Sequence, residues 1–419
     1  MRRIFLLLFG LFITFSITAQ SKKLKAIDEL LFQEKYPQAI EQLKRLIQKG
    51  DGTAMVNYRL GRAYLILQNP CEAIIYLEKA KQLDSLSIPI MQALSNGYLS
   101  SGMYPNAQKT LEWCRKLDTT DLQTNLLLAK AYTSQRMYKK SFQVYNQLCE
   151  SDTLNSYYHR QKGIIAEKMN YIQVAFNEFV KAYNLNPKDI LTLTKLTSLL
   201  NQMGMYEVAI KYCNQGLDIY PENSILLRKK ATMLINLRWF ENALSILEKL
   251  RQKDQCNNKS LKQLALCYMH EKEYNKALSA LDPSSPSFEN DPMVNLYLGI
   301  IHLKLNNTGE ALKFLQKAQK VGTPGYLGSI YLYKAKTYGQ TREFAKAIDA
   351  YKEHWKLDDS DPIILYEIAT TLEELGKHKK EAMSYYIQFI NQYQGKNKRR
   401  VEYSKERIMR IKEKIHFEK

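Results

Sequence analysis

A small residue recurs every 34 positions along most of the chain. The step holds over nine consecutive members and then lengthens by two and by one residue near the C-terminus. The members are Ala39, Ala73, Ala107, Ser141, Ala175, Ala209, Ala243, Ala277, Ala311, Ala347 and Ala382. Self-similarity at a fixed period of about 20–50 residues is the signature of a repeat protein, in which each unit packs only against its neighbours. The 419-residue chain is therefore predicted to be a linear array of similar units.

Within each unit, the spacing of small and bulky residues predicts two helices. Bulky residues lie three positions before and four after the first series, as Tyr104 and Leu111 flank Ala107. Steps of three and four place side chains on one face of a helix. Each unit is therefore predicted to be a hairpin of two helices that touch at small residues. A second small series lies twelve positions before most members of the first: Gly61, Ser95, Ala129, Gly163, Thr197, Ala231, Ala265, Gly299, Ala335 and Ala369.

This pattern resembles the tetratricopeptide repeat (TPR), which has a small residue near position 8, a tyrosine near 11, alanine near 20 and an aromatic residue near 24. The residues that match the position-11 tyrosine are Tyr64, Tyr98, Tyr132, Tyr268 and Tyr338. The resemblance implies an all-α, right-handed superhelical solenoid of about eleven TPR helical hairpins with a C-terminal capping helix. We place the array at residues 20–394, with repeats starting near residues 20, 54, 88, 122, 156, 190, 224, 258, 292, 328 and 362.

Three segments depart from the pattern. The first repeat carries Ile27 where a small residue is expected, so its first helix is predicted to be atypical. Residues 282–292 are rich in proline and serine, which predicts that the second helix of that repeat ends early. Residues 395–419 are basic and are interpreted as a capping helix, with a basic amphipathic helix for an anionic surface as the alternative. Its apolar residues fall at helical spacing: Val401, Ile408, Ile411 and Ile415.

The N-terminus has the layout of an export signal. Arg2 and Arg3 precede an apolar run over residues 4–15, and small residues follow up to Ala19. The run is shorter than the roughly 20 residues that span a bilayer. We therefore expect residues 1–19 to be a signal peptide cleaved after Ala19, with an uncleaved membrane anchor as the alternative. The leader resembles those of Bacteroidetes-type bacteria, which implies an exported, periplasmic TPR protein.

The residue types that carry catalysis, metal binding or disulfides form no recognisable motif. The six histidines are scattered, no pair has the spacing of a metalloprotease helix, and no glycine-rich phosphate loop occurs. We therefore expect no enzymatic activity, no cofactor, no metal site and no nucleic-acid partner. Cys114 and Cys213 occupy packing positions, whereas Cys256 and Cys267 are separated by roughly 13 Å of helical rise, too far for a disulfide. No essential disulfide is expected.

In the family that the chain resembles, the first helix of each hairpin lines a concave groove. Over the second to ninth repeats, the positions expected to face the groove hold eleven Lys or Arg and one acid, Glu167, against 61 basic and 42 acidic residues in the whole chain. Concentrated basic charge attracts acidic partners, tyrosine supplies contact area, and arginine binds carboxylates or phosphates bidentately. The predicted partner-binding residues are Tyr58, Arg59, Arg62, Asn96, Lys130, Tyr157, Arg160, Lys168, Lys195, Arg228, Lys229, Lys259, Lys262, Tyr297 and Lys304. The alternative is that these are solvated helix faces, some of whose side chains pair with acids on neighbouring repeats.

These observations predict a protein–protein interaction scaffold or adaptor in the cell envelope. It would bind an acidic or extended segment of a protein partner in the basic, tyrosine-lined groove, with at most peripheral membrane contact. The alternative is an envelope-associated binder of anionic glycan, peptidoglycan or lipid headgroups, consistent with the formal net charge of +19. An enzyme is the third and weakest hypothesis, because no motif supports it.

Overall fold

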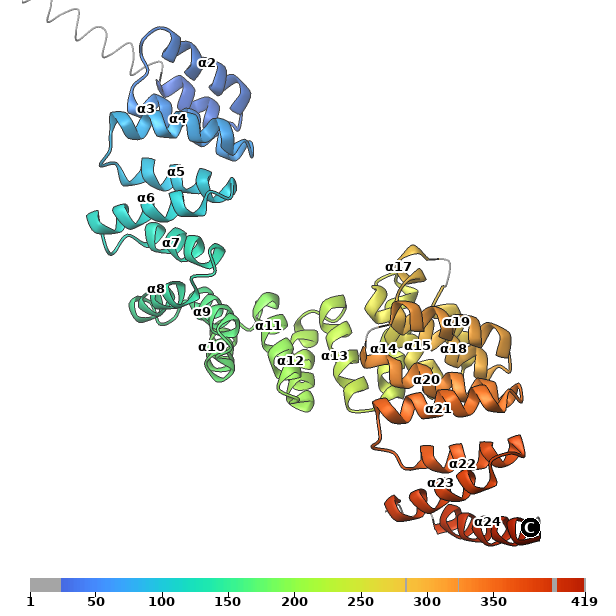
Figure 1. The fold of residues 1–419 in the computed structure, drawn as a ribbon. Helices are drawn as coiled ribbons and strands as arrows, with labels where there is room; N and C mark the ends of the chain where they lie inside the picture. Colours follow the sequence, from blue (N-terminus) through green and yellow to red (C-terminus); the bar gives the residue numbers. More distant parts are fainter. Residues whose placement is uncertain (1–23, 283–284, 323, 394–397, 418–419) are drawn as a thin grey trace, which may run out of the picture. The chain divides into compact units, whose positions relative to one another are not determined.

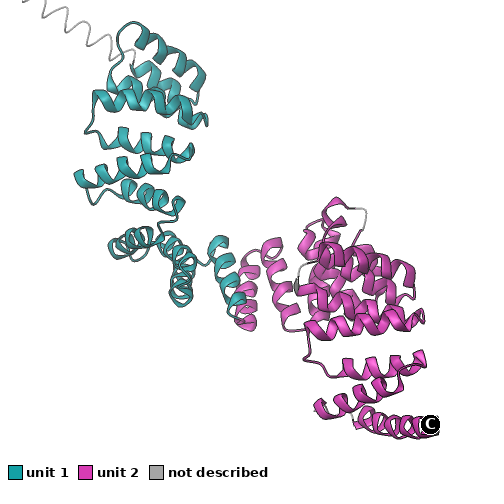
Figure 2. Cartoon of the chain, in the orientation of Figure 1, with its two compact units in different colours: residues 1–203 teal, residues 204–419 magenta. Residues whose placement is uncertain are grey.

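Helices separated by short turns make up the described chain (Figure 1). The computed structural model describes residues 24–282, 285–322, 324–393 and 398–417, and these contain no β-strand. The all-α repeat fold predicted from the sequence is confirmed. The predicted leader, residues 1–19, lies outside the described residues. The chain divides into two compact units, Met1–Met203 and Gly204–Lys419 (Figure 2).

In the first unit, consecutive helices pack against each other. Residues 24–32 are helical. The helices that follow are α2 (Tyr36–Gln48), α3 (Ala54–Ile66), α4 (Pro70–Leu83), α5 (Ile88–Ser100), α6 (Tyr104–Leu117), α7 (Leu122–Ser134), α8 (Tyr138–Ser151), α9 (Ser156–Lys168), α10 (Ile172–Leu185) and α11 (Ile190–Gln202). Helices α3, α5, α7, α9 and α11 therefore begin at intervals of 34 residues. Because α5 also packs against α3 and α7, the first helices of these hairpins form a layer.

The second unit continues the alternation of first and second helices. Its helices are α12 (Tyr206–Ile219), α13 (Ser224–Asn236), α14 (Phe240–Gln252), α15 (Asn258–His270), α16 (Tyr274–Ala280), α17 (Pro286–Glu289), α18 (Pro292–Lys304), α19 (Thr308–Val321), α20 (Pro324–Gln340), α21 (Phe344–Leu357), α22 (Ile363–Leu375), α23 (Lys379–Gln392) and α24 (Lys398–Phe417). The seven-residue α16 ends early, as the proline- and serine-rich stretch after it predicts. The first helices α13, α15, α18 and α20 again pack in succession.

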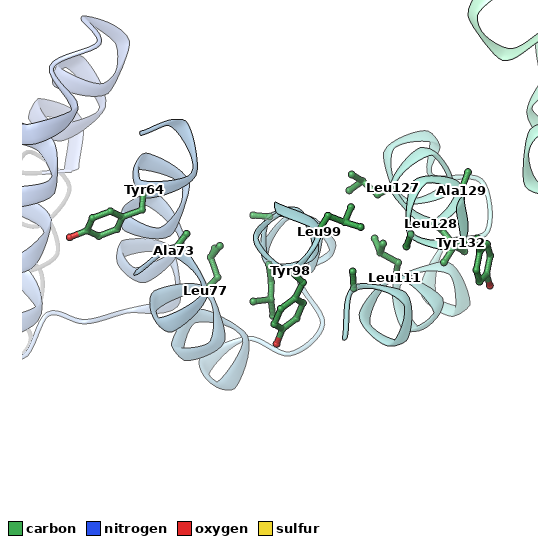
Figure 3. Packing of buried hydrophobic residues seen from close by; sticks show 14 of the residues in the cluster. Tyr64, Ala73, Leu77, Tyr98, Leu99, Leu111, Leu127, Leu128, Ala129 and Tyr132 are labelled. Carbon is green, nitrogen blue, oxygen red and sulfur yellow. The ribbon is translucent and has the colours of Figure 1, made fainter. Parts of the chain in front are cut away.

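The small residues of the 34-residue series are the contact points between helices. All eleven are fully buried, with 0% of their surface exposed. At Gly61, an added Cβ atom would lie only 2.4 Å from Cγ of Leu77, so the two helices of that hairpin approach closely because one partner has no side chain. Figure 3 shows buried residues of the first unit, among them Leu77, Leu111 and Leu128. Ile27, which stands where the second series would have a small residue, is also buried in this core and lies in a helix.

Hydrogen bonds from three of the five position-11 tyrosines join successive hairpins. The Tyr132 hydroxyl on α7 donates to Glu112 on α6 at 2.8 Å, and the Tyr268 hydroxyl on α15 donates to Glu248 on α14 at 2.7 Å. Tyr98 makes the equivalent bond to Glu78. Burial raises the pKa of Tyr132 to about 12, with the hydrogen bond to Glu112 acting in the same direction. The tyrosines therefore stabilise the joints between repeats.

The turn inside each hairpin contains a residue in the left-handed conformation. Gly102 and Gly204 have φ values of +74° and +73° there. Arg136 and Arg238 occupy the corresponding places in other repeats, with φ values of 58° and 62°. Glycine adopts this conformation without steric cost. The glycines visible in the sequence therefore mark only some of the turns that share this geometry.

The basic C-terminal segment forms α24, which packs against α23. Ile411 is buried, and Ile408 and Ile415 pack against the same apolar cluster as α22 and α23 residues. Arg407 makes a bidentate ion pair with Glu373 on α22, with N···O distances of 2.7 and 2.9 Å. The apolar stripe of α24 thus covers the last hairpin, as expected of a capping helix.

The described residues also show whether a helix could span a membrane and whether the cysteines are paired. Among the described helices, none combines the length and hydropathy that a bilayer-spanning helix requires. All six cysteines are free. Cys114 and Cys213 are fully buried, as predicted for packing residues.

Candidate functional site on the first helices

The predicted binding residues lie on the first helices of the hairpins. We call the solvent-accessible residues of these helices the first-helix surface: α3, α5, α7, α9 and α11 in the first unit, and α13, α15, α18, α20 and α22 in the second. The first unit holds nine of the predicted residues: Tyr58, Arg59, Arg62, Asn96, Lys130, Tyr157, Arg160, Lys168 and Lys195. The second unit holds six: Arg228, Lys229, Lys259, Lys262, Tyr297 and Lys304.

Two of the predicted cations pair with the aspartate that caps the next first helix. Arg160 on α9 pairs with Asp189, which also accepts the backbone N–H of Leu191 at the start of α11. Lys262 on α15 pairs with Asp291 at 2.8 Å, and Asp291 caps α18. Each pair spans 29 residues. These aspartates therefore combine a helix cap with a link between repeats.

The pKa of Asp291 reflects this double role. Burial alone would raise it, but hydrogen bonds from Lys262 and from the backbone N–H groups of Val294 and Met293 lower it below its ordinary value. The pKa of Asp189 is lowered in the same way, against the effect of burial, by hydrogen bonds from Thr192 and Arg160. Both carboxylates are thus held in the charged form that the neighbouring cations require.

Three further cations of the predicted set also bind neighbouring repeats. Arg59 forms a bidentate pair with Asp28, with N···O distances of 2.7 and 2.9 Å. Lys195 lies 3.0 Å from Glu167, the one acid predicted on this surface. Arg228 donates to the backbone carbonyl of Gln255 at 2.8 Å. Including the two aspartate-paired cations, five of the eleven predicted cations therefore hold the array together.

A second group of cations stays exposed. Lys130 and Lys168 in the first unit, and Lys259 and Lys304 in the second, are exposed and form no ion pair with any described residue. Arg62 is also exposed and stacks over the Tyr58 ring, with the guanidinium carbon 5.6 Å from the ring centroid. These side chains can therefore bind an anionic ligand without breaking a contact between repeats.

One hollow in the first unit gathers three predicted residues with apolar neighbours. It has a volume of about 420 Å³ and is lined by Tyr58, Arg59 and Arg62 together with Met55 and Ile66. Met55 and Ile66 are half exposed, at 49% and 51%. The Nη1 atom of Arg59 is buried without a hydrogen-bond partner in the structure. Asp28 also lines the hollow and already pairs with Arg59, so the donors left for an acidic group are Nη1 of Arg59 and the Arg62 guanidinium.

Comparisons with known families agree with the repeat. Models described as tetratricopeptide repeat match residues 24–88 and 193–223. A model described as anaphase-promoting complex, cyclosome, subunit 3 matches residues 236–318. The chain therefore contains tetratricopeptide repeats. Arrays of this family typically serve as protein–protein interaction scaffolds without enzymatic activity.

Curated relatives are distant and match in part. The chain is 24% identical to the BBSome complex member BBS4 of Bos taurus over 212 residues, which cover 51% of this chain and 40% of the relative. It is 22% identical to the TPR repeat-containing protein YpiA of Bacillus subtilis (strain 168), covering 68% of this chain and 67% of the relative. The chain thus spans less than half the length of the bovine protein.

Solved structures of similar architecture include yeast Tom70 and the P58(IPK) TPR domain. Tom70 shares 14% identity with a TM-score of 0.37, covering 92% of this chain and 95% of that chain. The P58(IPK) TPR domain shares 13% identity with a TM-score of 0.34, covering 85% and 98% respectively.

Some residues of the TPR first-helix surface were missed by sequence reasoning. Met55 and Ile66 occupy expected groove positions but are apolar, and selection by charge passed over them. Lys336 on α20 lies beyond the register slip, where the count of groove residues ended. It is exposed and stacks over the Tyr333 ring at 5.2 Å from the centroid. Although part of Lys336 is exposed, desolvation by the surrounding side chains lowers its pKa, an effect that nearby Glu367 opposes and Lys304 reinforces. Lys336 takes position 9 of the repeat that starts near residue 328, so the register already marked it as a groove position.

Proposed function

We propose that the chain is an exported interaction scaffold of the cell envelope that holds an acidic, extended segment of a protein partner on its first-helix surface. The leader layout at residues 1–19 motivates the location. The charge and aromatic content of the first helices motivate the chemistry of the partner.

The observation that carries the proposal is a surplus of cations after the repeats have been joined. Asp189, Asp291 and Glu167 each pair with a Lys or Arg of a neighbouring repeat. These acids are therefore already neutralised, whereas Lys130 and Lys168 remain exposed and without an ion pair among the described residues. An anionic segment crossing α7 and α9 would gain these cations at no cost to the array.

A role in assembly also has support from a relative. The bovine relative is a member of the BBSome complex. Stacked hairpins create extended concave binding surfaces, and such surfaces suit a member of a multi-protein complex. For this chain the partner remains defined by its chemistry alone: acidic and extended.

Binding of anionic glycan or lipid headgroups is the second candidate. The formal net charge of +19 favours it. An amphipathic membrane helix, however, needs a free apolar face. Ile408, Ile411 and Ile415 of α24 pack against the last hairpin, so headgroup binding by α24 would rest mainly on charge.

The test uses two triple variants with equal changes in charge. In the first-helix variant, Arg62, Lys130 and Lys168 are replaced by Glu. In the control variant, Lys49, Lys109 and Lys139, exposed residues on or beside second helices of the first unit, are replaced by Glu. Lys49 and Lys168 both lie at helix C-terminal ends, so the cost of reversing charge there is matched.

Tagged wild-type and variant chains are used for affinity capture from the native envelope fraction, followed by mass spectrometry. The expected result is that a partner captured by wild-type and control chains is lost with the first-helix variant, while circular dichroism remains helical for all three. Equal capture by both variants would contradict the proposal. Sedimentation with anionic liposomes or sacculi that depends on residues 395–419 would favour the second candidate.

A further inference from the structure

A buried cluster in the first unit lies away from the exposed cations of the first-helix surface. It consists of Cys149 on α8, His159 on α9 and Glu178 on α10, which are 6%, 6% and 5% exposed. One ligand atom of each side chain lies within 4.8 Å of the other two. Thiolate, imidazole and carboxylate are all ligands that Zn²⁺ accepts in proteins. The three residues come from three consecutive helices, so a bound ion would link two hairpins.

The hydrogen bonds of His159 match those of a metal ligand. Its Nε2 atom lies 3.1 Å from the backbone carbonyl oxygen of Thr153, and its Nδ1 atom lies 2.6 Å from Oε2 of Glu178. Both partners accept hydrogen bonds, whereas a neutral imidazole carries only one N–H group, so one ring nitrogen is left for a metal. With a metal on Nδ1, the Nε2–H group still donates to Thr153. Metal-bound histidines characteristically donate their second N–H to a carbonyl or carboxylate in this way.

Glu178 is also held as a ligand would be. Lys162 lies 3.1 Å from its Oε1 atom and Lys181 lies 3.8 Å away, which leaves Oε2 facing His159. Burial alone would raise the pKa of Glu178, but hydrogen bonds from His159 and Lys162 lower it, so the group is a carboxylate. The two lysines fix the carboxylate through the oxygen that the metal does not need.

The lysines do not exclude a cation, because the three ligands would neutralise it. In the bound form, a Cys149 thiolate and the Glu178 carboxylate carry two negative charges, which equal the charge of Zn²⁺, and His159 is a neutral ligand. Binding would release the thiol proton to solvent. Lys162 and Lys181 would therefore face a metal site of no net charge.

A neighbouring hollow gives solvent access to the cluster and leaves room for a fourth ligand. A hollow of about 460 Å³ opens beside the cluster and is lined by Cys149, Thr153, His159 and Lys162, among others. It can supply a solvent molecule as a fourth ligand. In a tetrahedral site with Zn–N and Zn–O bonds of about 2.0–2.1 Å, the Nδ1 and Oε2 atoms stand roughly 3.4 Å apart. The present 2.6 Å separation would widen by less than about 1 Å, within reach of a small rotation of the Glu178 side chain.

We propose that Cys149, His159 and Glu178 bind one Zn²⁺ ion, with solvent from the adjacent hollow as the fourth ligand. Thr153 and Lys162 orient two of the ligands. The ion would join α8, α9 and α10 and so stiffen the contact between two hairpins. This inference does not depend on the proposed partner binding, because the cluster is buried and the exposed cations take no part in it.

The test is titration of the chelator-treated full chain with Zn²⁺ by calorimetry, and with Co²⁺ by absorption spectroscopy. One equivalent of metal should bind, Co²⁺ should give a sulfur-to-metal charge-transfer band, and Zn²⁺ should raise the melting temperature. Cys149→Ser and Glu178→Gln should each weaken Zn²⁺ binding at least tenfold and remove the rise in melting temperature.

The matched control is Cys114→Ser. Cys114 is another buried thiol whose pKa burial raises to about 11, as it does for Cys149, but Cys114 is not part of any described metal-binding cluster. This variant should bind one equivalent of Zn²⁺ as the wild type does. If wild type and Cys149→Ser bind Zn²⁺ equally, or if Co²⁺ gives no charge-transfer band, the cluster is an ion-pair network and the proposal is wrong. Circular dichroism of each variant verifies that the comparison is between folded chains.

Discussion

At the scale of single residues, close approach between helices determines which side chains the repeat tolerates. The sequence predicted small residues at two positions of the hairpin, and the structure supplies the reason. At Gly163 an added Cβ would lie 2.8 Å from two ring atoms of Phe179, which is fully buried. Small and large residues on the two helices of a hairpin are thus matched as pairs.

Gly163→Ala should therefore destabilise the array. Overpacking against a ring that cannot move costs about 1–3 kcal/mol, partly offset by up to about 1 kcal/mol of helix propensity. The control is Gly309→Ala, because nothing lies within 4 Å of a Cβ added there. Urea unfolding followed by circular dichroism should show a lower midpoint for Gly163→Ala and an unchanged or higher one for Gly309→Ala. Equal midpoints for the two variants would disprove the close-packing argument.

The hydrogen bond between successive hairpins leads to a second prediction at the residue scale. Tyr268→Phe removes a 2.7 Å hydrogen bond to the Glu248 carboxylate, which should cost about 1–2 kcal/mol of unfolding free energy. Tyr338 occupies the same repeat position, but its hydroxyl has no hydrogen bond to a described residue, so Tyr338→Phe should cost less than about 0.5 kcal/mol. The two midpoints in urea test this, and a loss of equal size in both variants would count against the joint.

At the scale of helices, two aspartates that cap first helices also pair with a cation of the preceding repeat. Lys262 was predicted to be a groove residue on charge and position alone. Its true partner, Asp291, lies 29 residues away at the cap of the next first helix. Asp291 is visible in the sequence as an acid just before the next first helix. Groove positions alone do not identify the pair, because its acid lies outside them, at the cap of the next first helix.

The cap and the ion pair at Asp291 can be separated. Asn223 and Asn257 cap other first helices of this chain, so Asp291→Asn should keep the cap and lose the pair with Lys262, at less than about 1 kcal/mol. Asp291→Ala should lose both, with a further cost of about 1 kcal/mol. Unfolding midpoints should thus fall in the order wild type, Asn, Ala. An Asn variant as unstable as the Ala variant would contradict the separation.

The same residue predicts a dependence on pH. The folded pKa of Asp291 is below its ordinary value of 3.8, so its contribution to stability is present above that value and is lost as pH falls through the folded pKa. The unfolding free energy of the wild type should therefore drop more steeply below pH 3.8 than that of Asp291→Asn. Parallel profiles measured by urea unfolding would show that Asp291 contributes nothing to acid sensitivity.

Helix α24 offers a matched pair of arginines. Arg407 pairs with Glu373, which is only 16% exposed, whereas Arg410 pairs with the half-exposed Glu406 on α24 itself. Arg407→Ala should lower the unfolding free energy by about 1–2 kcal/mol, because Glu373 loses its bidentate partner. Arg410→Ala should cost less than about 0.5 kcal/mol. Thermal melting of the two variants compares them directly, and equal losses would argue against α24 as a cap.

At the scale of the whole molecule, the period of the sequence predicted the fold far better than the site. Helix starts at residues 54, 88 and 122 coincide with the expected repeat starts, because the small residues that become buried recur in the sequence at a fixed step. The period did not show which cations pair with a neighbouring repeat and which remain available to a partner. That division depends on whether an acid from the next repeat reaches each side chain, which is a property of the packed helices.

The central claim is that cations left unpaired by the array bind an acidic partner segment. The most direct measurement is the dissociation constant of the captured partner's segment for wild type, the first-helix variant and the control variant, at two salt concentrations. The account predicts at least tenfold weaker binding for the first-helix variant, binding within about twofold of wild type for the control, and weaker wild-type binding at higher salt. Equal dissociation constants for the two variants, or no effect of salt, would contradict it.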